Sequence, residues 1–294
     1  MRIKALFLLI LFCLLIIDYG FCLDWKNLHE KADKISLADA LNSVKSEPGS
    51  SDSLYILGLV YLNLHKDKEA QDTFSKILNL DPDATEAKWG LAESLRRQHR
   101  IKESEKILNE VIDKNPGFSP AYISLAYIKY IQMDFERCVR LALKVMRQGS
   151  KNVDLSNYVR SYTLYAGAKG MIAHYGGPIS KAVNGTAVLP NLRKAEKLQP
   201  DSPAVVFGLG SFYLLAPALA GGNLEKAEEY LKKTIEIDPL LSDGYVRLGQ
   251  LYKMRNDNDK YQEYLRKALE IDPKNEIALD IANGECKFIC VKSD

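Results

Sequence analysis

The residue types that most often carry out chemistry are few and widely spaced in this sequence. Its four histidines are His29, His65, His99 and His174. None has a second histidine or a cysteine four residues away, and none belongs to an HExxH sequence, which brings two imidazoles to one zinc ion. The sequence also has no phosphate-binding loop and no GxSxG nucleophile sequence. We therefore expect no metal, no cofactor and no enzyme activity.

Two cysteines near the C-terminus are the candidates for a disulfide bond. Cys286 and Cys290 lie in the sequence ECKFIC, after a segment at 276–283 that is expected to form a helix. A disulfide between them requires a turn, because a helix holds the Cβ atoms of residues four apart too far from each other. Such bonds form in proteins that are exported from the cytoplasm. A free pair of thiols is the alternative.

The first 22 residues indicate export. Arg2 and Lys4 precede thirteen apolar residues, Ala5 to Ile17, which is the pattern of a secretory signal peptide. Thirteen helical residues span about 20 Å, less than the roughly 30 Å hydrocarbon core of a membrane, so a permanent anchor is the weaker interpretation. Cleavage after Cys22 gives a periplasmic or secreted protein, whereas lipidation of Cys22 gives a protein anchored to the membrane.

Length and composition limit the possible fold and partners. The chain has 294 residues, of which 47% are hydrophobic and 27% are charged, a composition sufficient for a buried core. The 40 basic and 38 acidic residues are interleaved and give a formal net charge of +2. Because no basic patch or stripe stands out, we expect no nucleic acid among the partners.

Prolines mark an internal repeat. Pro48, Pro82 and Pro116 are spaced by 34 residues, as are Pro239 and Pro273. Proline disfavours helix at the residue before it, so each of these prolines marks the end of one helix and the reversal into the next unit. The spacing predicts helical hairpins that stack on one another.

The residues within each unit resemble the tetratricopeptide repeat (TPR). The unit that begins at Ser51 has the signature residues Leu57, Gly58, Tyr61, Ala70, Phe74 and Pro82. The unit from Ser242 repeats the pattern, and Cys138 stands at a small-residue position where we expect a buried filler. Stacked hairpins of this kind bury a continuous core. The resemblance covers about 51–273 and implies an all-α fold, a TPR-type right-handed α-solenoid of helical hairpins.

The repeat spacing divides the chain into successive segments. We expect a signal peptide at 1–22, a degenerate N-terminal hairpin at 23–50, three TPR units at 51–152, two TPR-like units with inserted Gly/Pro loops at 153–241, a TPR unit at 242–275, and a capping helix with a Cys-containing tail at 276–294. The lengths of the two inserts are inferred from the spacing of the prolines. The interval 116–200 exceeds two periods by sixteen residues, and 200–239 exceeds one period by five.

Both inserts fall between the first and second helix of consecutive units. One is AHYGGPISKAVNG at 173–185, and the other runs from Leu214 to Gly222. Stacking is expected to bring them together at one rim as part of a binding site. The insert residues that we assign to this site are Tyr175, Gly176, Gly177, Pro178 and Pro217. Simple helix termination is one alternative, and anion binding by the glycine amides beside Lys181 is another.

Aromatic residues are expected on the concave side of the solenoid, which the first helices line. The predicted groove residues are Tyr55, Trp89, Arg96, Tyr127, Tyr130 and Phe207. Such a groove suits an extended segment or an amphipathic helix of a partner. The alternative is that these rings pack between adjacent hairpins. From the repeats and the signal-peptide pattern we predict an exported scaffold that binds a protein or peptide partner through its concave face and rim loops.

The inserts and their surroundings resemble a narrower family. The sequences HYGGPISKAVNG and FGLGSFYLLAPALAGGNLEKAEEYLKKTIEIDP are similar to those of periplasmic TPR proteins associated with TRAP-type transporters (TatT-like). This resemblance covers about 165–239. It implies the alternative function, a transporter-associated periplasmic component that docks a solute-binding protein or shapes a passage for a small molecule.

Overall fold

The structure is a computed structural model that describes residues 24–289. The predicted signal peptide at 1–22, with Cys22, lies outside the described residues, and so does Cys290. Residues 24–289 form α-helices and one short 3-10 turn, joined by turns. In this part of the chain no helix is both long enough and apolar enough to cross a membrane.

Six helical hairpins follow one another along residues 51–271. Their first helices are α4 (Ser51–Asn63), α6 (Thr85–Arg97), α8 (Ser119–Ile131), α10 (Leu155–Tyr175), α13 (Pro203–Leu215) and α15 (Ser242–Met254). Their second helices are α5 (Asp67–Leu80), α7 (Ile101–Lys114), α9 (Phe135–Gln148), α12 (Val188–Leu198), α14 (Leu224–Ile237) and α16 (Asn258–Ile271). Each first helix packs against the second helix of its hairpin, and consecutive hairpins stack. The fold is therefore the TPR-type stack that the repeat predicts.

Five further helical elements of the described chain interrupt or flank this alternation. They are α2 (Trp25–Ala32), α3 (Leu37–Ser46), α11 (Pro178–Gly185), the 3-10 turn η1 (Ala218–Ala220) and α17 (Glu276–Ala282). Helices α2 and α3 both pack against α4. The elements α11 and η1 lie in the two predicted inserts. Helix α17 packs against α15 and α16 at the end of the stack, where a capping helix is expected.

Residues at fixed repeat positions end the helices. Asp81, Asp238 and Asp272 each precede a proline and have extended backbone angles, with ψ between 87° and 96°, because proline excludes the helical region there. The turns that follow α4 and α6 inside the first two hairpins each contain a residue with positive φ. The value is 55° at His65 and 61° at His99. These two histidines occupy the same position of consecutive repeats.

The small residues at the helix crossings are buried as the repeat predicts. Gly58 and Gly90 lie on either side of the Phe74 ring, and a Cβ added at either would lie 2.6 or 2.4 Å from a ring carbon. Ala70 and Cys138 stand at equivalent positions and are fully buried. Burial raises the pKa of the Cys138 thiol to about 12, so this cysteine is an unreactive part of the core.

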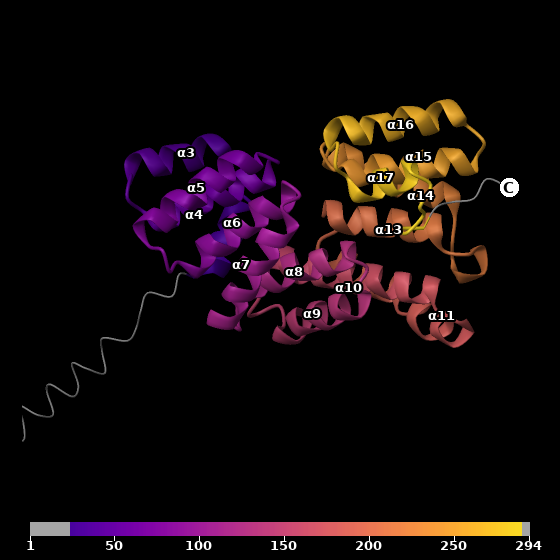
Figure 1. Ribbon diagram of the computed structural model, residues 1–294, viewed down its shortest axis with the longest axis horizontal. Helices are drawn as coiled ribbons and strands as arrows, with labels where there is room; N and C mark the ends of the chain where they lie inside the picture. Colours follow the sequence, from indigo (N-terminus) through magenta and orange to yellow (C-terminus); the bar gives the residue numbers. More distant parts are fainter. Residues whose placement is uncertain (1–23, 290–294) are drawn as a thin grey trace, which may run out of the picture.

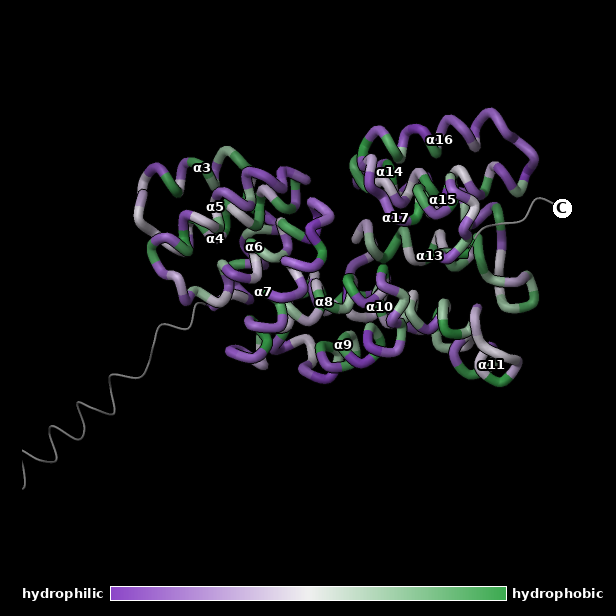
Figure 2. Tube along the Cα trace, in the orientation of Figure 1, coloured by the Kyte–Doolittle hydropathy of each residue, from purple (hydrophilic) through white to green (hydrophobic). Residues whose placement is uncertain are grey.

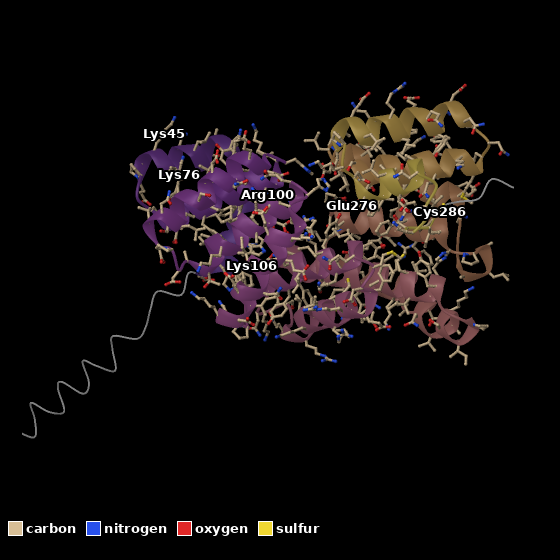
Figure 3. The ribbon with its side chains drawn as sticks, in the orientation of Figure 1. Lys45, Lys76, Arg100, Lys106, Glu276 and Cys286 are labelled. Atoms are coloured by element: carbon tan, nitrogen blue, oxygen red, sulfur yellow. The ribbon has the colours of Figure 1, made fainter. Side chains whose placement is uncertain are left out.

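The stack curves until its two ends meet. In Figure 1 the hairpins α4–α7 and α13–α16 form two facing halves that α8–α12 join. His65 lies 3.0 Å from the Asp238 carboxylate, across the gap between the halves. Figure 3 shows Arg100 and Glu276 at the facing edges of the two halves, and Glu276 contacts His99 at 3.1 Å. The hairpins therefore close into a ring with an inner face.

Candidate functional site

The chain's own helix α2 covers the predicted groove over α4 and α6. Tyr55 and Trp89 are 1% and 3% exposed. His29 of α2 lies 2.8 Å from the Tyr55 hydroxyl, and its ring centroid is 5.1 Å from that of Trp89. Trp25 packs edge-on against Phe118, which precedes α8. The expectation of an open groove at Tyr55 and Trp89 is therefore wrong, because a helix assigned to a degenerate hairpin lies across the inner face instead.

The turn after α2 ties this helix to α10. Asp33 accepts hydrogen bonds from Asn63 of α4 at 3.2 Å and from Ser156 of α10 at 2.6 Å. Asn157 of α10 lies 3.5 Å from His29 Nδ1. Burial lowers the pKa of His29, so its imidazole is neutral. The contacts from α2 to α10 join residues 123 and 128 positions apart, and no local signal in the sequence predicts them.

Arg96 and Tyr127 lie next to each other on the inner face. The Arg96 guanidinium carbon is 4.3 Å from the Tyr127 ring centroid, a cation–π contact. Arg96 also donates two hydrogen bonds, at 2.7 and 2.9 Å, to the buried Glu93, which contacts Arg97 and Ser124 as well. Burial alone would raise the pKa of Glu93, but its arginine partners hold it well below the ordinary value. Glu93 therefore stays ionised and fixes the orientation of Arg96.

A polar cavity remains beside α2, between α4, α6 and α10. Its volume is about 60 Å³, and its lining includes His29, Glu93, Arg97, Asn157 and Arg160. Glu93 is held ionised and His29 neutral, so neither is poised to exchange a proton near pH 7. Within residues 24–289, no group of three His, Cys, Asp or Glu side chains is placed to hold a metal ion. The cavity offers polar contacts rather than an acid–base pair.

The tail after α17 fills the inner face on the C-terminal side. Phe288 is 4% exposed and stacks on Tyr130, with ring centroids 6.2 Å apart. Arg247 of α15 donates to the Phe288 carbonyl from both terminal nitrogens at 3.3 Å. Tyr175 donates to the Lys287 carbonyl at 2.5 Å. Two predicted binding residues, Tyr130 and Tyr175, therefore contact the chain's own tail.

The predicted disulfide lies at this tail. Cys286 is disulfide-bonded and has a φ of 57°, in a turn beyond α17, which is the geometry that the prediction requires. Figure 3 shows it in the C-terminal half of the molecule. Cys290, its predicted partner, lies outside the described residues, so the pairing stays a prediction.

Phe207 is separated from the other predicted groove residues. It is half-buried and packs against the cluster of buried residues that includes Tyr162 and Leu192. Tyr130 packs against a different cluster, the one that contains Phe288. The structure thus distributes the predicted groove over separate packing environments, because the inner face turns with each hairpin.

The first insert is helical rather than a loop. Helix α10 is 21 residues long and ends at Tyr175, which is inside the predicted insert. Gly176 and Gly177 then break the helix, and α11 begins at Pro178, a position where proline needs no amide hydrogen. The expected Gly/Pro loop at 173–185 is corrected to a lengthened first helix and a short additional one, because only two glycines interrupt helix-forming residues.

The second insert is a tight turn. Helix α13 ends before Pro217, and η1 follows. Gly221 has a φ of 99°, and a Cβ at Gly222 would lie 1.9 Å from the Ala216 carbonyl oxygen, so both positions require glycine. Asn223 caps α14 through its side-chain oxygen, which accepts a backbone amide at 2.8 Å. The second insert therefore reverses the chain sharply and caps the helix that follows it.

Three of the insert glycines use their amides internally. Gly176 donates to a carbonyl of α10, and Gly221 and Gly222 donate to carbonyls of the turn around η1, at 3.0 to 3.1 Å. These three amide hydrogens are therefore engaged within the chain and are not free to bind an anion.

Apolar side chains of both inserts point to solvent. Ile179 and Val183, one turn apart on α11, are 81% and 64% exposed, and Leu219 of η1 is 104% exposed. Tyr175 is more than half exposed. Figure 1 shows α11 and the turn after α13 projecting at the same end of the molecule, and Figure 2 shows hydrophobic residues in both. We call Tyr175, Ile179, Val183 and Leu219 the insert surface.

Known repeat families match two parts of the chain. Residues 66–126 and residues 242–275 each match a model of the tetratricopeptide repeat. A comparison with curated proteins found no match. The chain therefore contains tetratricopeptide repeats, which are generally non-catalytic scaffolds that bind protein or peptide partners.

Solved structures with very different sequences share the fold. A chain of the APC/C hetero-tetramer Cut9–Hcn1 is 12% identical, with a TM-score of 0.59 over 85% of this chain and 46% of that chain. IFIT1 with Gppp-AAAA is 16% identical, with a TM-score of 0.55 over 79% of this chain and 54% of that one. A tetratricopeptide repeat protein from Parabacteroides merdae is 15% identical, with a TM-score of 0.52 over 88% and 97%. The chain spans about half the length of the first two. These similarities establish the all-helical TPR-type fold.

Proposed function

We propose that the protein is an exported, non-catalytic scaffold that binds a protein partner through the insert surface. The observation that carries the proposal is the exposure of Ile179, Val183 and Leu219 on elements that the regular hairpins lack. The hairpins α4–α5 and α15–α16 reverse without α11 or η1, so stacking does not require these elements. Exposed apolar surface on such elements is typical of an interaction site.

The partner class that we propose comes from the sequence of the same inserts. Their resemblance to TPR proteins associated with TRAP-type transporters suggests a solute-binding protein as the partner. The second role implied by that resemblance is a passage for a small molecule. Export is supported by the signal-peptide pattern at 1–22. In this proposal the inner face contributes less to partner binding than the repeats suggest, because α2 and the tail cover much of it.

A matched pair of variants tests the insert surface. The insert variant carries Ile179→Ser and Leu219→Ser, and the control carries Leu80→Ser and Leu240→Ser, which change exposed apolar side chains elsewhere. Both should keep the circular dichroism and the unfolding temperature of the wild type, because the altered side chains face solvent. Affinity capture from the cell envelope should recover one partner with the wild type and the control, and lose it with the insert variant.

The identity of the captured protein tests the scaffold role and the proposed partner class separately. A solute-binding protein supports the full proposal, whereas another protein supports the scaffold and rejects that partner class. Equal recovery by all three proteins overturns the role of the insert surface.

The N-terminus of the native protein tests export. Mass spectrometry should find a mature chain that begins near Leu23, or a lipid-modified Cys22. A cytosolic protein that retains Met1 would contradict export.

A further inference from the structure

Side chains from four helices hold the tail in the inner face of the ring. They are Tyr130 of α8, Tyr175 of α10, Arg247 and Gln250 of α15, and Asp280 of α17. We call these five residues the tail site. Because they come from the joining helices α8 and α10 and from α15 and α17 at the C-terminal end of the stack, the tail site depends on how these parts pack against each other.

The tail site binds the backbone of the tail. Asp280 accepts the amides of Lys287 and Phe288 at 2.9 and 2.8 Å. Gln250 donates to the Ile289 carbonyl at 2.9 Å. Together with the hydrogen bonds from Arg247 and Tyr175, every carbonyl of 287–289 has a partner in the tail site. Contacts to the backbone depend on the turn that a peptide forms and little on its side chains.

One side chain of the tail enters the site. The Phe288 ring stacks on Tyr130, whose ring centroid is 5.5 Å from that of Phe135. Phe135 in turn stacks on Tyr175 at 6.3 Å. A row of three rings therefore receives a fourth from the ligand, and aromatic pairs contribute beyond the area they bury. The Lys287 side chain is half exposed and contacts Glu285 of the tail itself.

The tail does not provide a hydrogen-bond partner for every polar group of the tail site. Arg247 is 3% exposed, but within residues 24–289 it contacts the Gln250 amide oxygen and the Phe288 carbonyl rather than a carboxylate. Its Nε has no hydrogen-bond partner there. A buried guanidinium with incomplete pairing is costly. A ligand that offers one more acceptor would therefore bind more tightly than the tail.

We propose that the tail site is a peptide-binding site, which the chain's own tail fills in cis. Its ligand in trans is a peptide turn of another protein with an aromatic residue at its tip. The tail then controls access, because the partner binds only after the tail leaves. The tail site shares Tyr175 with the insert surface and is otherwise separate from it. Its test leaves Ile179 and Leu219 unchanged, so either proposal can fail alone.

The full mature chain with Phe288→Ala tests the proposal. The probe is an oxidised, fluorescein-labelled peptide with the sequence of residues 285–294, and fluorescence anisotropy measures its binding. The variant should bind the peptide at least about tenfold more tightly than the wild type, whose own tail competes with it. Lys287→Ala is the matched control and should behave like the wild type, because its side chain is half exposed and pairs with Glu285 of the tail itself. A peptide that itself carries Phe288→Ala should not bind.

A Phe288→Ala protein with wild-type circular dichroism that binds the peptide no better than the wild type overturns the proposal. Hydrogen exchange on the unmodified protein gives an independent test if the variant does not fold. The Phe288 amide should exchange about 100-fold faster than that of Leu125 in the core of α8, through local release of the tail. Equally slow exchange at both positions would show that the tail leaves only on global unfolding, and would also overturn the proposal.

Discussion

The imidazole of His99 contacts a carboxylate from the opposite end of the chain, with its Nε2 2.9 Å from Asp272. Its Nδ1 lies 3.1 Å from Glu276. His65, one repeat earlier, makes the same contact with Asp238, one repeat before Asp272, and both pairs are 173 residues apart. The 34-residue period therefore places the same histidine–aspartate contact at two successive repeats. Together the two contacts close the ring of hairpins.

We expect the contact at His99 to weaken at alkaline pH. Hydrogen bonds to Asp272 and Glu276 raise the pKa of His99 to about 9. Its stabilising effect is therefore complete below the unfolded pKa near 6.5 and is lost as the pH rises through about 9. Because the ring is partly exposed and solvent screens the charges, the effect on the free energy of unfolding is about 1 kcal/mol or less.

Small-angle scattering and thermal unfolding near pH 7 and near pH 10 measure this effect. The wild type should become less stable and more open at the higher pH. His99→Gln should show a smaller difference between the two conditions, because it removes the imidazole and leaves every other titratable group of the chain in place. Identical pH responses of the two proteins would contradict the prediction.

Helix α2 should leave the inner face on acidification. Burial lowers the pKa of His29, and this outweighs Asp154 and Asp33, which act in the opposite direction. The stability that His29 contributes is therefore complete above its unfolded pKa near 6.5 and decreases as the pH falls below that value. Trp25 and Trp89, the two tryptophans of the chain, both contact the His29 ring. Their fluorescence should shift to longer wavelength, and His29→Gln should lack this transition.

Replacement of the buried Glu93 should be strongly destabilising. Glu93→Gln removes the carboxylate that pairs with Arg96 and leaves a buried charge uncompensated, a loss of about 3–5 kcal/mol. Urea unfolding measures it. The control is Glu103→Gln, which removes an exposed ion pair with Arg100 and should leave the urea midpoint unchanged. A similar midpoint for both variants would mean that the buried pair contributes little.

A methyl group at Gly90 should overpack the first two hairpins. The Cβ would lie 2.4 Å from the Phe74 ring, so Gly90→Ala should cost about 1–3 kcal/mol. In a Phe74→Leu background the same change should cost less, because the smaller side chain leaves room. A double-mutant cycle measured by denaturant unfolding detects this coupling. Strictly additive losses would show that Phe74 is not the neighbour that limits Gly90.

The local features of the fold were predictable from the sequence. The 34-residue proline spacing predicted the stacked hairpins, and the small-residue pattern predicted the burial of Cys138. Helix ends before Asp81 and Asp238 and the cap at Asn223 also followed from residue type. Each of these depends on interactions within one hairpin or between neighbours, where sequence separation is short.

Only the tertiary structure decided which parts of the inner face are open. The sequence placed Tyr55 and Trp89 correctly on first helices, but their burial depends on α2, which reaches α10 across the ring. The contacts of Phe288 with Tyr130 and of His99 with Asp272 likewise depend on where the two ends of the stack meet. That position is the sum of small rotations between six consecutive hairpins, which no single repeat encodes.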